Sequence, residues 1–222
     1  NIEQMKVLVF DTETTGLINK KFGKYPSISN SKEYPYVVQL SFILYCTIRK
    51  DILVERDFII KIPSTVYISP KSTEIHRITN EMSQKQGISM KEALSTFMLC
   101  ANDSHAIVAH NIDFDKHVLQ AEAYRNQIND PFAIKSNPTY FDTMVMGKSI
   151  CNIRQQHIYT GEIFLKSPKL IELYKKLFNQ TPKELHNSLI DIVACLRCFV
   201  KIYTKKDIYQ DCYRIRTLIR HE

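Results

Sequence analysis

The sequence has no long hydrophobic run: within its 222 residues, no stretch approaches the roughly eighteen consecutive apolar residues that a membrane-spanning helix needs. Its N-terminus also lacks the basic and then apolar pattern of a secretory signal peptide. These two absences predict an intracellular, cytoplasmic protein that uses no membrane. The chain begins with Asn1 rather than Met, which leaves open whether residues precede it in a longer protein.

A disulfide framework is absent as well. The six cysteines lie in apolar surroundings without regular spacing, at Cys46, Cys100, Cys151, Cys195, Cys198 and Cys212. This pattern is typical of reduced thiols in the core of an intracellular protein. Cys195 and Cys198 form a C-x-x-C pair, but no second cysteine or histidine pair completes a zinc site, so core packing is the favoured interpretation.

What the sequence does contain is enough apolar material for one ample core, since 44% of its residues are hydrophobic and 10% are aromatic. We therefore predict a single domain over residues 1–222. The net charge of +7 and the pI of about 9.0 indicate an anionic partner, most commonly nucleic acid. The richness in Lys, Ile, Asn and Tyr also fits an AT-rich genome, such as that of a virus or a parasite, so both explanations of the charge stay open.

The most informative stretch is residues 7–16, in which an apolar run ends in two carboxylates two residues apart, Asp11 and Glu13. Such a run predicts a buried strand with functional side chains at its end. Side chains alternate between faces along a strand, so the two carboxylates point the same way and repel each other. A cation between them, a bound proton or full solvation would relieve the repulsion. Mg²⁺ or Mn²⁺ is the natural cation, because these ions prefer hard oxygen ligands.

The next segments predict a loop and a hairpin. Residues 18–35 are polar and contain several lysines, which predicts a long surface loop. Because this loop leaves directly from the carboxylates, its lysines either guide a phosphate backbone toward them or are simply solvated. Residues 36–45 and 52–62 are rich in Val, Ile, Leu and Phe and are joined by a short polar turn. They predict a β-hairpin, so the sheet begins antiparallel.

Beyond residue 69, helical spacing alternates with short apolar runs. We predict helical turns at 72–76 and 80–82, a helix from Ser89, a strand at 105–109, a helix N-capped by Asn111, a strand at 138–142, an irregular segment at 147–167, a helix from Pro168 to Asn179, a buried helix at 187–203 and a basic amphipathic helix within 204–222. This order predicts an α/β fold with a mixed sheet flanked by helices.

Two carboxylates, Asp113 and Asp115, lie in the first turn of the helix that follows Asn111. The helix dipole favours negative charge there, which gives both a purely structural explanation. Residues two apart on a helix do not share a face, so at most one of them joins Asp11 and Glu13.

Asp191 is the other anomaly, because it lies in a helix that is apolar nearly all round. An uncompensated buried carboxylate is costly, so Asp191 needs a cation or a line of hydrogen-bond donors. His186 precedes it by five residues. Strand ends and helix starts collect functional groups in open α/β sheets. Four carboxylates and one histidine at such positions suit two-metal phosphodiester hydrolysis.

Three ordered motifs carry a family resemblance: residues 10–17 (FDTETTGL), 110–115 (HNIDFD) and 186–191 (HNSLID). With supporting matches at 75–79 and 141–143, the sequence resembles the DEDDh subfamily of DnaQ-like 3′–5′ exonucleases. In that family the acid of the second motif follows Phe, which selects Asp115 over Asp113. The likeness covers about residues 6–203, and the 18–35 loop and the 204–222 segment fall outside it.

The resemblance implies a ribonuclease H-like fold, with a mixed five-stranded sheet flanked by helices, and two divalent cations, Mg²⁺ or Mn²⁺. Asp11 would bridge both ions, and Asp115 would help to hold the second. Glu13 and Asp191 would hold the ion that carries the attacking water. His186 would be the general base, since its near-neutral pKa suits proton transfer.

The resemblance also implies a surface for the terminal nucleotide. Its members would be Thr12, Thr14, Thr15, Gly16, Leu17, His110, Asn111 and Phe114. Gly16 would allow a close approach of the substrate to the backbone. Phe114 either stacks on a base or packs in the core, and its helical spacing with Val118 favours the core.

The function that the resemblance implies is metal-dependent 3′–5′ exonuclease activity, which releases nucleoside monophosphates from single-stranded 3′ ends. DNA, in proofreading or repair, is the first expectation for the substrate. RNA is an alternative, because recognition of the 2′-hydroxyl depends on details of the pocket. A non-catalytic nucleic-acid-binding domain of a larger assembly is another. Asn1 and the basic final segment also suggest association with a polymerase or a repair complex.

Overall fold

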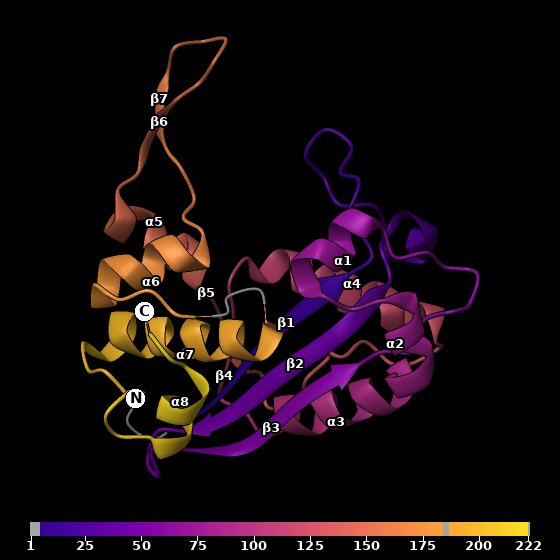
Figure 1. Cartoon of the computed structure of the whole chain (residues 1–222), viewed down its shortest axis with the longest axis horizontal. Helices are drawn as coiled ribbons and strands as arrows, with labels where there is room; N and C mark the ends of the chain where they lie inside the picture. The colour runs from indigo at the N-terminus through magenta and orange to yellow at the C-terminus, as the bar shows by residue number, and fades with distance from the viewer. Residues whose placement is uncertain (1–4, 184–186, 222) are drawn as a thin grey trace.

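The computed structural model, which describes residues 5–183 and 187–221, is built around a five-stranded sheet (Figure 1). The strands lie in the order β3-β2-β1-β4-β5. Their bounds are β1 Lys6–Thr14, β2 Val37–Cys46, β3 Asp51–Ile59, β4 Ala106–Ala109 and β5 Thr139–Asp142. Helices pack on both faces, so the predicted α/β fold class with a mixed five-stranded sheet is confirmed.

The helices connect and cover the strands. They are α1 Pro70–His76, α2 Asn80–Gln86, α3 Met90–Asn102, α4 Ile112–Arg125, α5 Thr143–Cys151, α6 Leu170–Phe178, α7 Ser188–Thr204 and α8 Tyr213–Leu218, with a 3₁₀ helix, η2, at Ile28–Glu33. None of the helices in the described part of the chain is both long enough and apolar enough to cross a membrane.

The sheet is mixed because its two halves are connected differently. β1, β2 and β3 are antiparallel neighbours, and a tight turn at 47–50 joins β2 to β3, as the hairpin prediction requires. β1, β4 and β5 run parallel. Parallel neighbours need long crossover connections, which here pass through helices, so β1 lies at the centre and is covered on both sides.

Burial of β1 on both faces divides its side chains between two cores. Leu8 and Phe10 pack with α3 and α4 on one face. Val7 and Val9 pack with α7 on the other face, where the buried thiols of α7 also lie. Every second residue of β1 points to the same face, so the face that carries Val7 and Val9 also carries Asp11 and Glu13. The period of the strand therefore carries its carboxylates onto the α7 face.

The start of α4 differs from the prediction that Asn111 caps it. Asn111 has a left-handed backbone, with φ 74°, and its side chain makes no capping hydrogen bond. The carboxylate of Asp142 instead accepts hydrogen bonds from the backbone N–H of Asn111 (3.0 Å) and of Ile112 (3.2 Å). It also accepts one from Met144 at the start of α5 (2.8 Å). One carboxylate at the end of β5 thus caps two helices, as the helix dipole favours.

The prediction that residues 147–167 are irregular is wrong. After α5, the chain forms a two-stranded antiparallel hairpin from β6 (Arg154–Gln156) and β7 (Ile163–Leu165). This hairpin projects from the body of the molecule (Figure 1). Its strands have only three residues each, too few for a periodic pattern to reveal them.

The predicted helix within 204–222 is helical only over the six residues of α8. Its apolar positions at Ile208, Cys212, Ile215 and Ile219 are nevertheless all buried against α7 and the sheet. A turn at 208–211 brings the first of them inward without helical geometry. Spacing therefore identified the buried side chains of this segment but not its backbone conformation.

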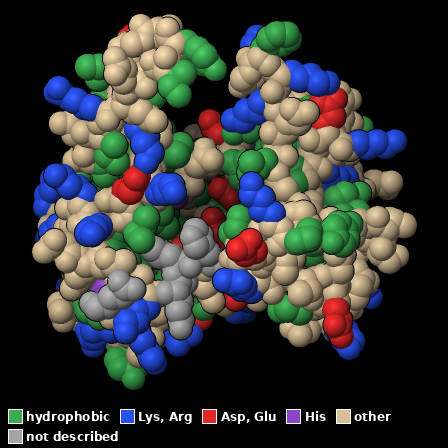
Figure 2. Space-filling model, turned by 45° about the horizontal axis from the view of Figure 1, so that its top comes forward, with side chains coloured by type: hydrophobic (Ala, Val, Ile, Leu, Met, Phe, Trp, Pro, Cys, Tyr) green, Lys and Arg blue, Asp and Glu red, His purple; other side chains and the backbone are tan. Residues whose placement is uncertain are grey.

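The surface is hollowed between two projecting segments. Figure 2 shows a cleft with acidic side chains on its floor, and Lys and Arg side chains on both sides of it. The hairpin β6–β7 stands on one side of this cleft, and the loop that precedes η2 stands on the other, as their places in Figure 1 indicate. The cleft therefore opens directly over the end of β1.

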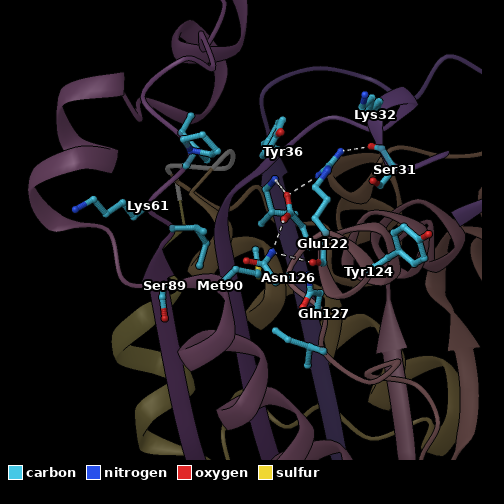
Figure 3. Close-up of a pocket in the computed structure, with 16 residues that line it drawn as sticks. Ser31, Lys32, Tyr36, Lys61, Ser89, Met90, Glu122, Tyr124, Asn126 and Gln127 are labelled. Atoms are coloured by element: carbon cyan, nitrogen blue, oxygen red, sulfur yellow. Dashed lines mark hydrogen bonds and ion pairs between the residues drawn. The ribbon is translucent and has the colours of Figure 1, made fainter. Parts of the chain in front are cut away.

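The predicted surface loop at 18–35 is exposed at its tip but anchored at its end. Arg125 of α4 donates hydrogen bonds to the carbonyl oxygens of Ser31, Tyr34 and Pro35. Its partner Glu122 is almost fully buried, at 3% exposed, and also accepts a hydrogen bond from the backbone N–H that opens β2 (3.0 Å). Figure 3 shows this ion pair in the wall of a pocket of about 1030 Å³. The Arg125–Glu122 pair in this wall therefore anchors the end of the loop.

Candidate metal centre and active site

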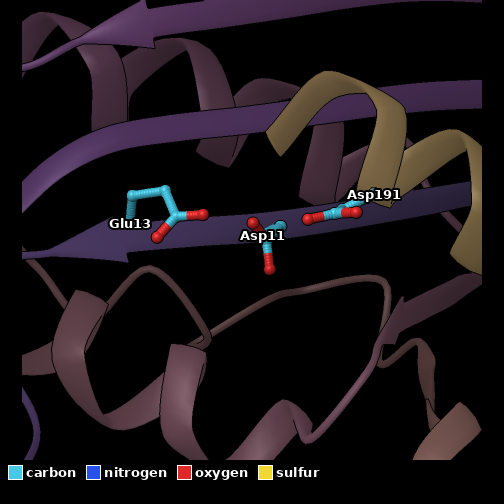
Figure 4. Close-up of side chains that lie close together, drawn as sticks. All are labelled: Asp11, Glu13 and Asp191. Atoms are coloured by element: carbon cyan, nitrogen blue, oxygen red, sulfur yellow. The ribbon is translucent and has the colours of Figure 1, made fainter. Parts of the chain in front are cut away.

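The end of β1 and the first turn of α7 bring three carboxylates together. Asp11, Glu13 and Asp191 each offer an oxygen, and these oxygens all lie within 4.8 Å of one another (Figure 4). Asp11 and Glu13 share a face because side chains alternate along β1. Asp191 reaches the same place from α7, which packs across that face. Two residues adjacent on a strand face and one that is distant in the sequence thus form a single acidic cluster.

Burial and mutual repulsion raise the pKa values of this cluster. The pKa of Asp11 lies well above its ordinary value, first because of burial and then because of the neighbouring carboxylates. The pKa of Glu13 is raised to about 8, again mainly by burial. A set of ionised carboxylates this close is unfavourable without a cation, so these residues fit a divalent ion. A ligand set made only of oxygen suits Mg²⁺ or Mn²⁺ rather than softer metals.

Asp115 lies beside this cluster, in the first turn of α4, and is only 3% exposed. Its Oδ1 accepts hydrogen bonds from the backbone N–H of Thr12 (3.0 Å) and from the Thr12 hydroxyl (2.7 Å). Burial raises the pKa of Asp115 to about 7, and these two hydrogen bonds oppose the rise. Asp113, in the same helical turn, is exposed. Of the two candidate acids, Asp115 is therefore the one that faces β1.

Thr12, for which a substrate contact is predicted, makes a contact within the protein. It is 6% exposed, and its hydroxyl is used by Asp115. Because neighbouring residues on a strand face opposite ways, Thr12 reaches the α4 side while Asp11 and Glu13 reach the α7 side. The structure thus assigns Thr12 a role in orienting Asp115.

We expect Thr12→Val to weaken metal binding rather than substrate binding. The substitution keeps the shape of the side chain and removes one of two donors to Asp115, so the apparent affinity for Mg²⁺ should fall about tenfold, as for the loss of an outer-shell partner. Titrating Mg²⁺ against the hydrolysis that the family resemblance implies measures this, and the KM for the substrate should stay unchanged. A raised KM with an unchanged dependence on Mg²⁺ would instead show that Thr12 contacts the substrate.

Ser188 is a site residue that the sequence reasoning quoted but gave no role. Its side chain is fully buried, and its hydroxyl donates to Oδ2 of Asp11 (2.9 Å). This hydrogen bond lowers the pKa of Asp11 and so opposes the larger rise that burial causes. The available signal was its position inside the third motif, three residues before Asp191. His186, the predicted general base, lies outside the described residues.

The turn after β1 is anchored to the start of β2. The N–H of Thr15 donates to the Tyr36 carbonyl (2.9 Å), and the Thr15 hydroxyl accepts from the Tyr36 N–H (3.0 Å). Thr14 donates to the Gly16 carbonyl (2.6 Å). A Cβ on Gly16 would meet nothing within 4 Å, and Leu17 is 89% exposed. This fixed turn offers a small residue and an exposed apolar side chain beside the acidic cluster.

The other residues that were predicted to contact the substrate, His110, Asn111 and Phe114, make contacts within the protein. Nε2 of His110 lies 3.1 Å from the Pro168 carbonyl, which only accepts, so Nε2 carries the proton and Nδ1 accepts from the Thr143 hydroxyl (2.9 Å). Burial lowers the pKa of His110, which favours this neutral form. Phe114 packs against the core, and the N–H of Asn111 binds a carboxylate at the end of β5.

Comparisons with known proteins agree with this geometry. Solved structures of Exonuclease I from E. coli, in complex with dA16 or with dT13, match with TM-scores of 0.62 and 0.64 at 17% and 18% identity, over 89% of this chain and 41% of theirs. Exonuclease I from Methylocaldum szegediense matches with a TM-score of 0.63 at 18% identity, over 92% of this chain and 42% of that one. This chain thus spans about two fifths of the length of these structures. None of the curated proteins matches it by sequence.

The chain also matches a protein family over most of its length. The model of the exonuclease family RNase_T matches residues 8–199, a span that contains the three motifs and the acidic cluster. Structural similarity at such low identity establishes a shared fold, whereas the family model covers most of the chain. The resemblance inferred from the motifs is therefore confirmed, and the chain belongs to the RNase_T exonuclease family.

Proposed function

We propose that this protein is a metal-dependent 3′–5′ exonuclease that releases nucleoside monophosphates from single-stranded 3′ ends, with DNA as its preferred substrate. The observation that carries the proposal is the acidic cluster of Asp11, Glu13 and Asp191, whose oxygens lie within 4.8 Å of one another where the end of β1 meets the first turn of α7. Membership of the RNase_T family supports it. The single-stranded oligonucleotides bound by the similar E. coli Exonuclease I structures favour DNA.

The proposal includes two divalent cations, Mg²⁺ or Mn²⁺. Asp11, Glu13 and Asp191 would hold them, with Asp115 completing the set from α4. When bound, such ions stabilise the negative charge that develops on a phosphodiester and lower the pKa of water. Ser188 and Thr12 orient two of these carboxylates through hydrogen bonds, so their lone pairs face the cleft in a defined direction.

The other residues of the motifs would position and activate the reactants. The turn of Thr14, Thr15 and Gly16 would hold the terminal nucleotide against an anchored backbone, and Leu17 would contact its base. His186 would accept the proton of the attacking water, which a neutral imidazole does well near pH 7. The water's oxygen would then attack the phosphorus as the bond to the 3′-oxygen of the preceding nucleotide breaks.

We expect His186→Ala to lower kcat by roughly 10²- to 10⁴-fold, the usual contribution of a general base. Mg²⁺ affinity and KM should change little, because no ligand to the ions is removed. Single-turnover hydrolysis of a single-stranded oligonucleotide measures the effect. His105→Ala, an exposed histidine beside the start of β1, at the end of the strand opposite to Asp11 and Glu13, is the matched control and should retain the parent kcat. Equal values of kcat for the two variants would show that His186 is not the general base.

One experiment tests the proposed function directly. Single-stranded DNA, single-stranded RNA and a DNA duplex with a mismatched 3′ end, all of matched sequence and labelled at the 5′ end, are incubated with and without Mg²⁺. A ladder of products shortened from the 3′ end, present only with Mg²⁺ and strongest for single-stranded DNA, is the expected result. A stronger ladder for RNA would make the protein an exoribonuclease. Binding without any product would make it a non-catalytic nucleic-acid-binding domain.

A further inference from the structure

The hairpin β6–β7 exposes more apolar surface than its size explains. Four large hydrophobic side chains are exposed on it: Ile158 by 88%, Tyr159 by 91%, Ile163 by 66% and Phe164 by 42%. A two-stranded hairpin is marginally stable by itself, and a cluster of exposed apolar groups on a projecting element usually marks a binding surface. We therefore take these exposed side chains of the hairpin as a surface that binds a partner molecule.

The tip of the hairpin is held in a defined shape by its own hydrogen bonds. The N–H of Gly161 donates to the His157 carbonyl (2.9 Å), and the N–H of His157 donates to the Glu162 carbonyl (2.9 Å). The side-chain amide of Gln156 donates to the Gly161 carbonyl (3.0 Å). These bonds close the turn around Tyr159, whose ring lies 6.0 Å from that of His157. The tip thus presents an aromatic ring on a structured turn.

The opposite wall of the cleft has a related composition. In the loop before η2, Phe22 is fully exposed and lies within the short turn closed by a 3.0 Å hydrogen bond from the N–H of Lys24 to the carbonyl of Lys21. The ammonium group of Lys20 lies 3.8 Å from the ring centre of Tyr25. Lys21 pairs with Glu33 at 3.5 Å, and both side chains of that pair are exposed. This wall therefore combines an exposed aromatic ring with exposed lysines.

The charge of the two walls and their position beside the cleft indicate which kind of molecule binds between them. The two walls flank a cleft that has acidic side chains on its floor (Figure 2). Single-stranded polynucleotides bind where aromatic side chains stack on bases and cations contact phosphates. A protein partner would match the apolar hairpin but not a wall of lysines that leads to the proposed catalytic site. The combination favours a polynucleotide.

We propose that the hairpin β6–β7 and the loop at 18–27 are the two walls of a binding channel for a single-stranded polynucleotide. Bases beyond the cleaved nucleotide would stack on Tyr159 and Phe164 from one side and on Phe22 from the other, while Lys20 and Lys24 would contact the phosphates. The inference rests on the proposed function, because it takes the acidic cluster as the point at which the 3′ end is cut. It adds the path of the strand upstream of that point.

The test separates binding along the channel from chemistry at its floor. Tyr159→Ala combined with Phe164→Ala, and separately Phe22→Ala, are compared with Tyr213→Ala, which removes another exposed ring (74%) from α8. Binding is measured by fluorescence anisotropy with labelled oligothymidylate and oligouridylate of about 20 nucleotides, with Ca²⁺ in place of Mg²⁺ to hold back cleavage. Chemistry is measured by hydrolysis of the p-nitrophenyl ester of thymidine 5′-monophosphate, which is too short to reach the walls.

We expect the Kd for the oligonucleotide to rise about tenfold in each channel variant and to stay unchanged in the Tyr213→Ala control. Hydrolysis of the short ester should be the same in all of them. The polymer with the lower Kd identifies DNA or RNA as the natural strand. An unchanged Kd in the channel variants would overturn the proposal and point to a protein partner for the hairpin. If the parent protein did not hydrolyse the short ester, that result would instead contradict the proposed function.

Discussion

Asp11→Asn is expected to abolish hydrolysis and, at the same time, to stabilise the metal-free protein. The rate should fall by about four orders of magnitude, because the central carboxylate of the acidic cluster is lost while its shape remains. The melting temperature in EDTA should rise by about 2–4 °C for each kcal/mol of repulsion that is relieved. Asn can still accept the hydrogen bond that Ser188 donates, so the local packing is kept.

This opposition of activity and stability distinguishes a functional cluster from an incidental one. Residues that repel one another in the folded state are retained where function needs them. Asp113→Asn is the matched control, since Asp113 is exposed and should affect neither property. Activity assays and thermal melts with and without Mg²⁺ provide the comparison. A destabilised Asp11→Asn protein would mean that Asp11 acts in folding rather than as part of a repulsive metal site.

Removal of divalent ions should stop hydrolysis and make stability depend on pH. The pKa of Glu13 in the folded protein is raised to about 8 and that of Asp115 to about 7, against about 4 in an unfolded chain. Between these values the folded state binds more protons than the unfolded state, so the free energy of unfolding falls as pH rises. In EDTA, the melting temperature should therefore decrease from about pH 5 to about pH 8.

Mg²⁺ should reverse this trend, because the cation takes the place of the protons. Its effect on the melting temperature should be greatest near pH 8, where the cluster is most ionised. Near pH 7, Mg²⁺ binding should release protons, which calorimetry detects as a heat that varies with the ionisation enthalpy of the buffer. Glu13→Gln should flatten the pH dependence in EDTA. A melting temperature that does not depend on pH, or full activity in EDTA, would contradict a metal site here.

The main elements of the fold could be predicted because their signals are local. The alternation of side chains in β1, the hairpin of β2 and β3, and the helical spacing of α3 and α7 depend on neighbours within a few residues. The same periodicities placed Asp11 and Glu13 on one strand face. Three motifs in order then supported the family, which the match over residues 8–199 confirms.

The segments that could not be predicted lack such local signals. Each strand of β6–β7 is three residues long, and the segment before α8 is shaped by a turn rather than by a helix. Asn111 looked like a helix cap, but a carboxylate 31 residues away in the sequence takes that role. A carboxylate at the end of another strand is as good a partner for helix N–H groups as a side chain nearby, and only packing decides between them.

The sequence by itself determined which residue types meet at the end of β1 and the family to which the chain belongs. Only the tertiary structure decided how they are held: Thr12 orients Asp115 across 103 residues of sequence, and Ser188 binds Asp11 across 177. It also decided that a hairpin and a lysine-bearing loop stand on either side of a cleft with acidic side chains on its floor (Figures 1 and 2). The reason is physical, because periodicity encodes the direction of each side chain on its own element, whereas hydrogen bonds and clefts depend on how distant elements pack.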